Sequence, residues 1–427
     1  MKKIVVGLIS ILTSIGASAQ LTLDYCMQKA EENYPLVMRY ALIEQTATLE
    51  LSDIHKAWLP NLTASAQMNL QSAVPSFPDA LKGIMDNMGQ KIKGMAVLQY
   101  KLAVDVDQLI WDGGKNKARR QTAEARKELS DAQLKAQIYP VREKVLNLFF
   151  GILLMQQQIE QTETTVELLD ANRQRLESML RNGTALQADI DMLTAQRLTI
   201  EQQIQQARGA IRGYRELLSI YIGEKIGDDV ALVAPPSTMP TDLQSNRPEL
   251  KIFEANLNLD KALDRETDLS IMPSLSAFAQ AYYGYPGFNY FKSMFSWVPT
   301  INALVGVRMT WNITPYYKKK DAKRKIELSG LSTEVEKSTF LYNSRLLTAE
   351  QENQIQTLRD VSASDGEIVT LRENVRRVAE SQLRNGIIDM TGLLSKITDE
   401  RQAKLTAQFH QIEILQAIYK LKYILNQ

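Results

Sequence analysis

The chain has 427 residues and a formal net charge of +1, from 50 lysines and arginines and 49 acidic residues. A nucleic-acid partner would normally require a basic excess, so this balance predicts none. Cys26 is the only cysteine and there are 2 histidines, which excludes a disulfide framework and a metal site built from cysteine pairs. The sequence contains no nucleophile motif, phosphate loop or cofactor motif, so we expect a protein that is not an enzyme.

Residues 1–19 have the pattern of a signal peptide. Lys2 and Lys3 are followed by an apolar stretch over residues 4–15, and Ala17-Ser18-Ala19 supplies the small residues of a cleavage site. The apolar stretch is shorter than the about 20 residues that a membrane-spanning helix needs, and no later segment reaches that length. The sequence therefore predicts export and a mature chain that begins at Gln20.

Two alternations of apolar and polar residues follow a helix-like segment over residues 34–57. They predict strands at about 61–73 and about 97–111, since a period of two is typical of a strand with one apolar face. Lys101, Asp105 and Asp107 occupy polar positions of the second strand. Strands of about 10 residues can cross a bilayer when they are tilted.

Residues 115–180 are rich in good helix formers, with Pro140 as the only proline. A helix of this length would extend about 100 Å, and Pro140 should kink it because proline lacks the backbone N–H. The sequence Leu180-Arg181-Asn182-Gly183 then predicts a turn. The return helix over 185–222 has the apolar spacing of a coiled coil, with Arg197 as the one polar member of the stripe.

The second half of the chain repeats this order after a proline-rich linker at 234–246. Leu383-Arg384-Asn385-Gly386 repeats the turn, and Pro35 and Pro60 recur as Pro248 and Pro273. The mature chain is therefore predicted to contain two copies of one structural unit. The first covers 20–233 and the second 247–427, with strands at about 274–285 and 300–313, a long helix over 318–383 and a return helix over 387–425.

Four strands per chain are too few to close a bacterial membrane barrel, which needs at least eight, and open strand edges are not tolerated in lipid. If the strands span a membrane, several chains must share one barrel, with the helices continuing as a tube. On this hypothesis Lys101, Asp105, Asp107 and Arg308 face a wet lumen. Aromatic residues near strand ends would form the interfacial girdles: Trp111, Trp297, Trp311, Tyr283 and Tyr285. A soluble two-layer sheet with one solvated face would show the same alternation.

The two-fold repeat, the strand pairs that lead into long helices and the repeated turn resemble the TolC family of outer-membrane efflux proteins. Asp112-Gly113-Gly114 resembles the family's phenylalanine-aspartate-glycine-glycine turn, with Trp111 in place of the phenylalanine. The resemblance covers nearly all of the mature chain. It implies an α+β membrane protein of TolC-like fold: a homotrimer whose four strands per chain form a shared twelve-stranded β-barrel in the outer membrane, continued by a long antiparallel coiled-coil α-helical barrel.

The resemblance also implies a function and partners. Such a duct passively conducts substrates from an inner-membrane RND or ABC transporter and a periplasmic adaptor, in tripartite efflux or type I secretion. The two turns resemble the family's arginine-tyrosine-x-x-glycine element at the periplasmic tip, which implies adaptor docking at Leu180, Arg181, Asn182, Gly183, Leu383, Arg384, Asn385 and Gly386. Asp189, Asp191 and Asp389 are the candidates for an entrance gate, although the family's entrance aspartates in the second repeat fall on Gly392 and Ser395.

Two other classes of protein fit part of the sequence. A periplasmic adaptor has one helical hairpin flanked by β-rich domains, whereas this chain predicts two hairpins in tandem and lacks those domains. A structural coiled-coil protein of the cell envelope would not need four strands of bilayer length. The outer-membrane duct is the hypothesis that uses every predicted element.

Overall fold

A computed structural model describes residues 21–228 and 230–427, so the predicted signal peptide lies outside the described residues. The chain divides into two compact units. One unit comprises the described residues of 21–40, 132–250 and 336–427, and the other comprises residues 41–131 and 251–335. Each unit therefore takes segments from both predicted repeats. No helix in the described part of the chain has the length and apolarity needed to cross a bilayer.

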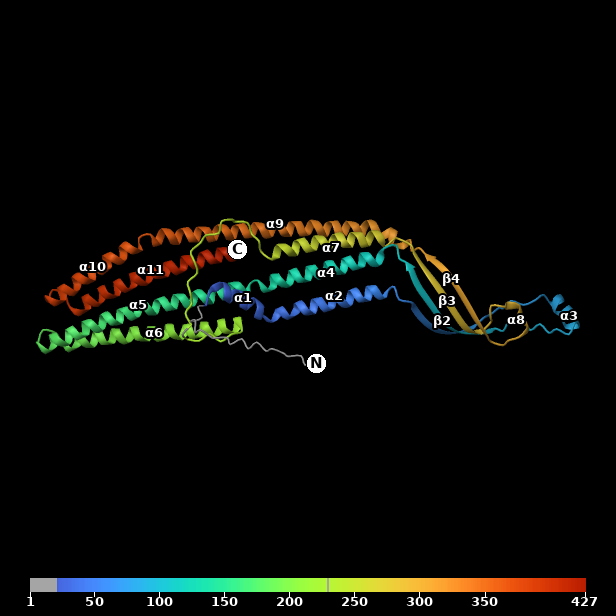
Figure 1. The fold of residues 1–427 in the computed structure, drawn as a ribbon, viewed down its shortest axis with the longest axis horizontal. Coiled ribbons are helices and arrows are strands. Elements are labelled where there is room, and N and C mark those ends of the chain that lie inside the picture. Colours follow the sequence, from blue (N-terminus) through green and yellow to red (C-terminus); the bar gives the residue numbers. More distant parts are fainter. Residues whose placement is uncertain (1–20, 229) are drawn as a thin grey trace, which may run out of the picture. The chain divides into compact units, whose positions relative to one another are not determined.

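The unit of residues 41–131 and 251–335 contains one antiparallel sheet with the strand order β1-β2-β3-β4 (Figure 1). Pairing of β2 with β3 joins the strand pair of the first repeat to that of the second. Within the described residues β1 and β4 each have one neighbour, so both outer edges are open. The strands are β1 (Asn61–Leu70), β2 (Leu98–Trp111), β3 (Ser274–Tyr285) and β4 (Thr300–Thr310).

Helices precede and follow each strand pair in the sequence. Short helices also lie in the two loops that join paired strands, α3 (Asp79–Asn87) and α8 (Tyr290–Phe295), and the sequence did not predict them. The flanking helices are α2 (Met38–Lys56), α4 (Lys115–Ile138), α7 (Glu249–Leu269) and α9 (Thr314–Ser362).

The Asp-Gly-Gly turn between β2 and α4 has a clear physical reason. Asp112 is buried, and its carboxylate accepts hydrogen bonds from the backbone N–H of Gly114 (2.8 Å) and Asn116 (2.6 Å). It thus satisfies amide groups at the start of α4 that have no partner within the helix. Gly113 has a φ of +70°, and a Cβ there would lie 2.4 Å from Cβ of Met272. Only glycine fits this turn without strain.

The other unit is built from two helical hairpins, drawn side by side in Figure 1. Their backbones neighbour one another in the order α6-α5-α11-α10, which leaves α6 and α10 as the outer helices. The hairpin helices are α5 (Val141–Arg181), α6 (Gln187–Ile222), α10 (Asp365–Arg384) and α11 (Met390–Leu425), preceded in the chain by α1 (Leu23–Asn33) and the 3-10 turn η1 (Pro35–Val37).

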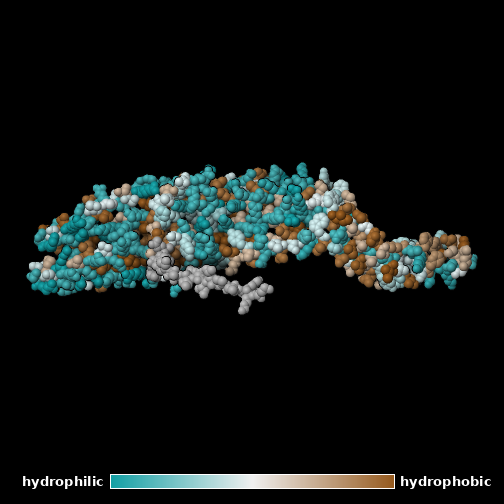
Figure 2. All heavy atoms as spheres, viewed as in Figure 1, coloured by the Kyte–Doolittle hydropathy of each residue, from teal (hydrophilic) through white to brown (hydrophobic). Residues whose placement is uncertain are grey.

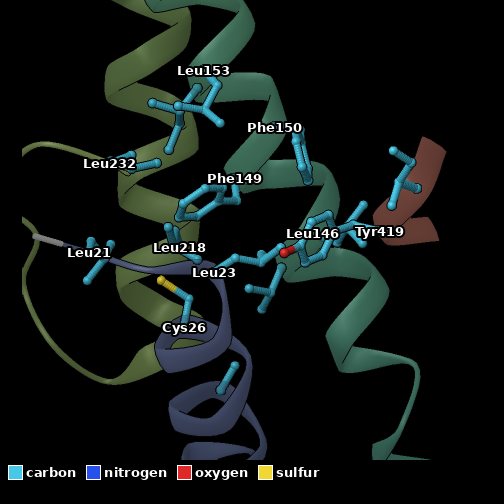
Figure 3. Close-up of a cluster of buried hydrophobic side chains, with 14 of the residues drawn as sticks. Leu21, Leu23, Cys26, Leu146, Phe149, Phe150, Leu153, Leu218, Leu232 and Tyr419 are labelled. Carbon is cyan, nitrogen blue, oxygen red and sulfur yellow. The ribbon is translucent and has the colours of Figure 1, made fainter. Parts of the chain in front are cut away.

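An apolar core holds these helices together where α1 meets them (Figure 3). Phe149 and Phe150 of α5 are fully buried between Leu218 of α6 and Tyr419 of α11, and α1 contributes Cys26. A second core nearer the hairpin turns contains Leu176, Leu193, Met390 and Leu393. The two hairpins therefore share cores and form one packed layer.

Both predicted long helices are interrupted, which corrects the prediction of single helices over 115–180 and 318–383. In the first repeat α4 ends at Ile138 and α5 begins at Val141, on either side of Pro140. In the second repeat α9 ends at Ser362 and α10 begins at Asp365 without a proline. The intervening sequence is Ser362-Ala363-Ser364-Asp365-Gly366. Serine and aspartate compete for backbone hydrogen bonds and glycine is flexible, so this stretch favours a helix boundary.

Candidate functional sites: the sheet faces and the hairpin tips

One face of the sheet is apolar on all four strands. The register pairs Val106 with Leu62 and Ala279, and residues that are directly paired point to the same side of a sheet. The face is solvent-exposed in the single chain; Ile301, for example, is 82% exposed. Figure 2 shows hydrophobic side chains over the strands. The residues of this face include Leu62, Met68, Leu70, Leu102, Val104, Tyr283, Ile301, Val305, Val307 and Met309, all of them exposed.

The opposite face carries the predicted lumen residues, and the register brings them together. The Lys101 ammonium group donates to Gln280 Oε1 (3.1 Å), and the Gln280 amide in turn donates to Asp105. Asp107 accepts a hydrogen bond from Ser276 (3.4 Å) and lies 3.9 Å from Arg308. The polar face thus carries two small networks of charged and polar groups, which need water or one another as partners.

Two aromatic side chains complete this polar face. The guanidinium carbon of Arg308 lies 4.5 Å from the ring centre of Phe278, and Lys101 Nζ lies 5.0 Å from that of Tyr282. Gly306, opposite Phe278, leaves room for the ring, since a Cβ at this position would approach the ring to 2.9 Å. These cation–π contacts hold both basic side chains flat against the sheet. The sequence analysis did not identify Phe278, Tyr282 or Gln280.

The predicted girdle residues lie at both ends of the strands. A bulge between Leu109 and Trp111 pairs Trp111 with Leu275, which moves its side chain onto the apolar face. Trp311 follows β4 at the same end of the sheet, and Trp297 lies in the loop at the other end. Tyr285 contradicts the prediction: it is 2% exposed, and its hydroxyl donates to Ser293 O (2.9 Å) beneath the loops.

The two hairpin tips have the same backbone geometry. Gly183 and Gly386 have φ values of +75° and +70°, the left-handed conformation that glycine adopts without cost. After them, Thr184 N–H donates to Met179 O and Ile387 N–H donates to Gln382 O, both at 2.9 Å. This is the Schellman motif that satisfies the last carbonyls of a helix. Leu180 and Leu383 pack against the core near the tips, whereas Arg181, Asn182, Arg384 and Asn385 are exposed.

Two of the three candidate gate aspartates cap helices. Asp189 accepts a hydrogen bond from the N–H of Leu186 (3.1 Å) at the start of α6, and Asp389 accepts one from Gly392 (2.8 Å) at the start of α11. A complete capping box has two bonds: the side chain of N3 accepts the N-cap amide, and the side chain of the N-cap accepts the N3 amide. Asp189 makes the former bond and Asp389 makes the latter. Each repeat therefore uses one half of the same motif. Asp191 accepts a bond from the Gln187 amide (2.9 Å) and is exposed.

The polar interruptions of the coiled-coil stripes are ion pairs at equivalent positions of the two hairpins. Arg197, the polar member of the α6 stripe, lies 2.9 Å from both Asp170 and Glu201. Glu400 occupies the same position in α11, is buried, and pairs with Arg376 and with Lys404. Each hairpin thus has an ion pair across it, with opposite charges at the equivalent return-helix positions Arg197 and Glu400. The sequence analysis noted Arg197 but missed Arg376 and Glu400.

Comparison with known proteins agrees with this geometry. Residues 27–223 match the family model described as outer membrane efflux protein. No curated protein matches the chain in sequence. The matched segment covers most of the first repeat. The resemblance predicted from the sequence is therefore confirmed.

Solved structures of outer-membrane channels share the fold along nearly the whole chain. The outer-membrane channel OprN superposes with a TM-score of 0.66 at 14% identity, covering 94% of this chain and 89% of that one. The outer membrane protein VceC from Vibrio cholerae gives 0.64 at 12% identity, with 94% and 95% covered. The MtrE outer membrane channel of Neisseria gonorrhoeae, in its open state, gives 0.62 at 13% identity, with 94% and 88% covered. The TolC-like fold class predicted from the sequence is confirmed.

Proposed function

We propose that three copies of this chain form a passive duct across the outer membrane. The four-stranded sheets would close a twelve-stranded barrel, and the helices would continue it as a tube into the periplasm. The observation that carries this proposal is a sheet with one largely apolar face, one charged face and two edges that have no neighbour within the described residues. In lipid, open edges leave backbone groups without partners, so such a sheet must close on other copies.

The number of copies follows from the space that a duct needs. Two chains would supply eight strands, and a barrel of about eight strands is filled by its own side chains. Three chains supply twelve and leave room for a lumen lined by Asp105, Asp107, Lys101 and Arg308. Strands of β1's length extend about 33 Å, and the usual tilt reduces this to the about 25 Å apolar band of outer-membrane barrels.

The helical unit offers an edge for the same closure. Within the order α6-α5-α11-α10, the outer helix α10 exposes an apolar stripe at coiled-coil spacing, formed by Ile368, Leu371, Val375 and Val378. The other outer helix, α6, exposes Met192, Leu198 and Leu217. In a closed ring, α10 of one copy would pack against α6 of the next and bury these apolar side chains.

The hairpin tips are the proposed entrance and adaptor-docking surface. The exposed Arg181 and Arg384 make no ion pair within the described residues and are available to a partner. Asp189, Asp191 and Asp389 would bring nine carboxylates to the tip of a trimer, a ring that attracts cations. The partners would be a periplasmic adaptor and an inner-membrane transporter of the RND or ABC type. Export would depend on the predicted signal peptide.

Face-selective labelling tests the proposal. Single cysteines at Asp105 and Arg308 should react with a small hydrophilic thiol reagent in outer-membrane vesicles, because they would line a wet lumen. Cysteines at Val104 and Val307 are the matched controls, one residue away on the apolar face, and should stay unlabelled until detergent replaces lipid. Equal labelling of both faces would show that the sheet lies in water and would refute the duct.

A further inference from the structure

The loop between β1 and β2 and the loop between β3 and β4 lie at the same end of the sheet. Together they form a small packed cap with an exposed apolar surface. The cap comprises residues 71–97 and 286–299, which contain α3 and α8. Trp297 donates its indole N–H to Gly94 O (2.8 Å), and the N–H of Lys93 donates to Met294 O (3.1 Å), so the two loops are joined. Met95 and Tyr285 are buried between them.

Helix α3 is amphipathic, and its apolar side is exposed. Leu81, Ile84 and Met88 recur at helical spacing on one side, and Ile84 and Met88 are 57% and 71% exposed. Asp79, Lys82 and Asp86 lie on the other side, where Lys82 pairs with Asp79 at 3.0 Å. Phe291 of α8, whose ring centre lies 6.3 Å from that of Phe77, adds a further exposed aromatic side chain. An apolar surface of this kind is normally covered by a partner or by lipid.

The geometry points to a lipid surface as the occupant: we propose that α3 and Phe291 lie in the headgroup region of the outer leaflet and anchor the barrel there. This inference rests on the proposed function, because it places the apolar face of the sheet in lipid. Figure 2 shows that hydrophobic side chains continue from the strands to this end of the unit. A short helix with one apolar and one charged side is the form that lies in the plane of a membrane interface.

The stem of the loop keeps α3 close to the membrane. Gln71 N–H donates to Val97 O (3.0 Å) and Met95 N–H donates to Pro75 O (3.3 Å), so the β1–β2 ribbon continues to Pro75. Five residues of ribbon extend about 16 Å along a tilted strand direction. With the usual tilt this is about 12 Å along the bilayer normal. The ribbon therefore ends close to the membrane surface, and residues 76–78 lead from it to α3.

The charge of the cap favours phosphate-bearing headgroups. Its four lysines are Lys82, Lys91, Lys93 and Lys292, and its two acidic residues are Asp79 and Asp86. Lys93 Nζ also lies 5.8 Å from the ring centre of Trp297, at the level where tryptophan is favoured in membranes. Basic side chains beside an apolar surface bind anionic lipid in preference to zwitterionic lipid.

Fluorescence quenching of single labelled cysteines tests the inference on the whole chain. In a Cys26→Ala background, Ile84→Cys, Asp86→Cys and Val305→Cys carry an environment-sensitive fluorophore in vesicles of phosphatidylethanolamine and phosphatidylglycerol. A lipid with a nitroxide near the headgroup should quench the label at Ile84 at least about threefold more than at Asp86, on the opposite side of the same helix. Iodide on both sides of the membrane should show the reverse order. Replacing Lys91, Lys93 and Lys292 with glutamine should reduce the difference.

The outcomes separate this inference from the proposed duct. The label at Val305, on the apolar face of the sheet, should be quenched by a nitroxide deep in the acyl chains, and failure there would refute the barrel itself. If Val305 responds but Ile84 is quenched by iodide as strongly as Asp86, α3 lies in water and only the anchor is refuted. If Ile84 is protected from both quenchers, another copy of the cap covers α3, and the anchor is refuted as well.

Discussion

Asp389 caps the N-terminus of α11 through one hydrogen bond to a backbone amide, so its capping role can be tested by substitution. Asp389 Oδ1 accepts the N–H of Gly392 (2.8 Å), one of the amides in the first turn of α11 that have no carbonyl partner within the helix. Replacing the residue with alanine removes this acceptor, whereas asparagine keeps it and caps as well as aspartate does. We therefore expect Asp389→Ala to loosen the first turn of α11 and Asp389→Asn to leave it intact.

The size of the effect follows from the energy of a cap. Loss of an N-cap side chain costs about 0.5–2 kcal/mol, and 1.4 kcal/mol corresponds to a factor of about ten. Where the first turn of α11 exchanges by local opening, its amides should exchange with solvent about 2- to 30-fold faster in the alanine variant. The charge contributes a smaller part, because a carboxylate at an exposed helix N-terminus stabilises by about 0.3–1 kcal/mol.

Hydrogen–deuterium exchange of a peptide spanning the tip of the second hairpin measures this effect. Asp189→Ala and Asp189→Asn provide the matched pair in the first hairpin, where the bonded amide belongs to Leu186. Gly392→Glu should slow exchange, because it supplies the missing half of the capping box and a Cβ at Gly392 meets no atom closer than 3.4 Å. If the alanine and asparagine variants of Asp389 exchange at the same rate, the side chain is not a cap and the reasoning is wrong.

Four further predictions concern the core, the layer edge and the entrance. Burial raises the pKa of the Cys26 thiol to about 12, so Cys26 should resist alkylation at pH 8 until the protein unfolds. Because the folded state favours the neutral thiol, the contribution of Cys26 to stability is present below the pKa of the unfolded chain. This contribution is lost as the pH rises toward 12. Arg376→Leu should destabilise by about 3–5 kcal/mol by leaving Glu400 buried without its main partner, whereas Arg376→Leu with Glu400→Leu should recover most of the loss in denaturant titrations. Leu371→Arg with Val378→Arg should prevent assembly in size-exclusion light scattering if α10 packs against another copy, while Thr370→Arg, away from the stripe, should not. Asparagine at Asp189, Asp191 and Asp389 together keeps the caps and should lower the cation-to-anion permeability ratio in planar bilayers, and an unchanged ratio would place the gate elsewhere.

The alternating strands and the repeated turns could be predicted from the sequence because their signals are local. A period of two over β1 and β2 needs a strand with two unlike faces, and Gly183 and Gly386 mark left-handed turns wherever the helices lead. The bulge before Trp111 leaves no such local signal, since it depends on pairing with β3. The same is true of Tyr285, whose burial depends on the loop that carries Ser293.

The candidate site was harder to predict because its residues gain their roles from other parts of the chain. The sequence marks Asp189 and Asp389 as acids just past a turn, but only the hydrogen-bond geometry shows that they cap helices. In the sequence, Gln280 is an ordinary polar residue of β3. Only the β2–β3 register shows that it bridges Lys101 and Asp105. The break between α9 and α10 contains no proline. Its serines, aspartate and glycine are a weaker signal, and the sequence analysis did not use it.

The number of chains in the detergent-extracted assembly tests the central claim most directly. Native mass spectrometry of the protein purified from the outer membrane should give the mass of three mature chains, with no stable monomer, because one four-stranded sheet cannot close in lipid. A folded monomer or a dimer that retains the four-stranded sheet would contradict the shared barrel.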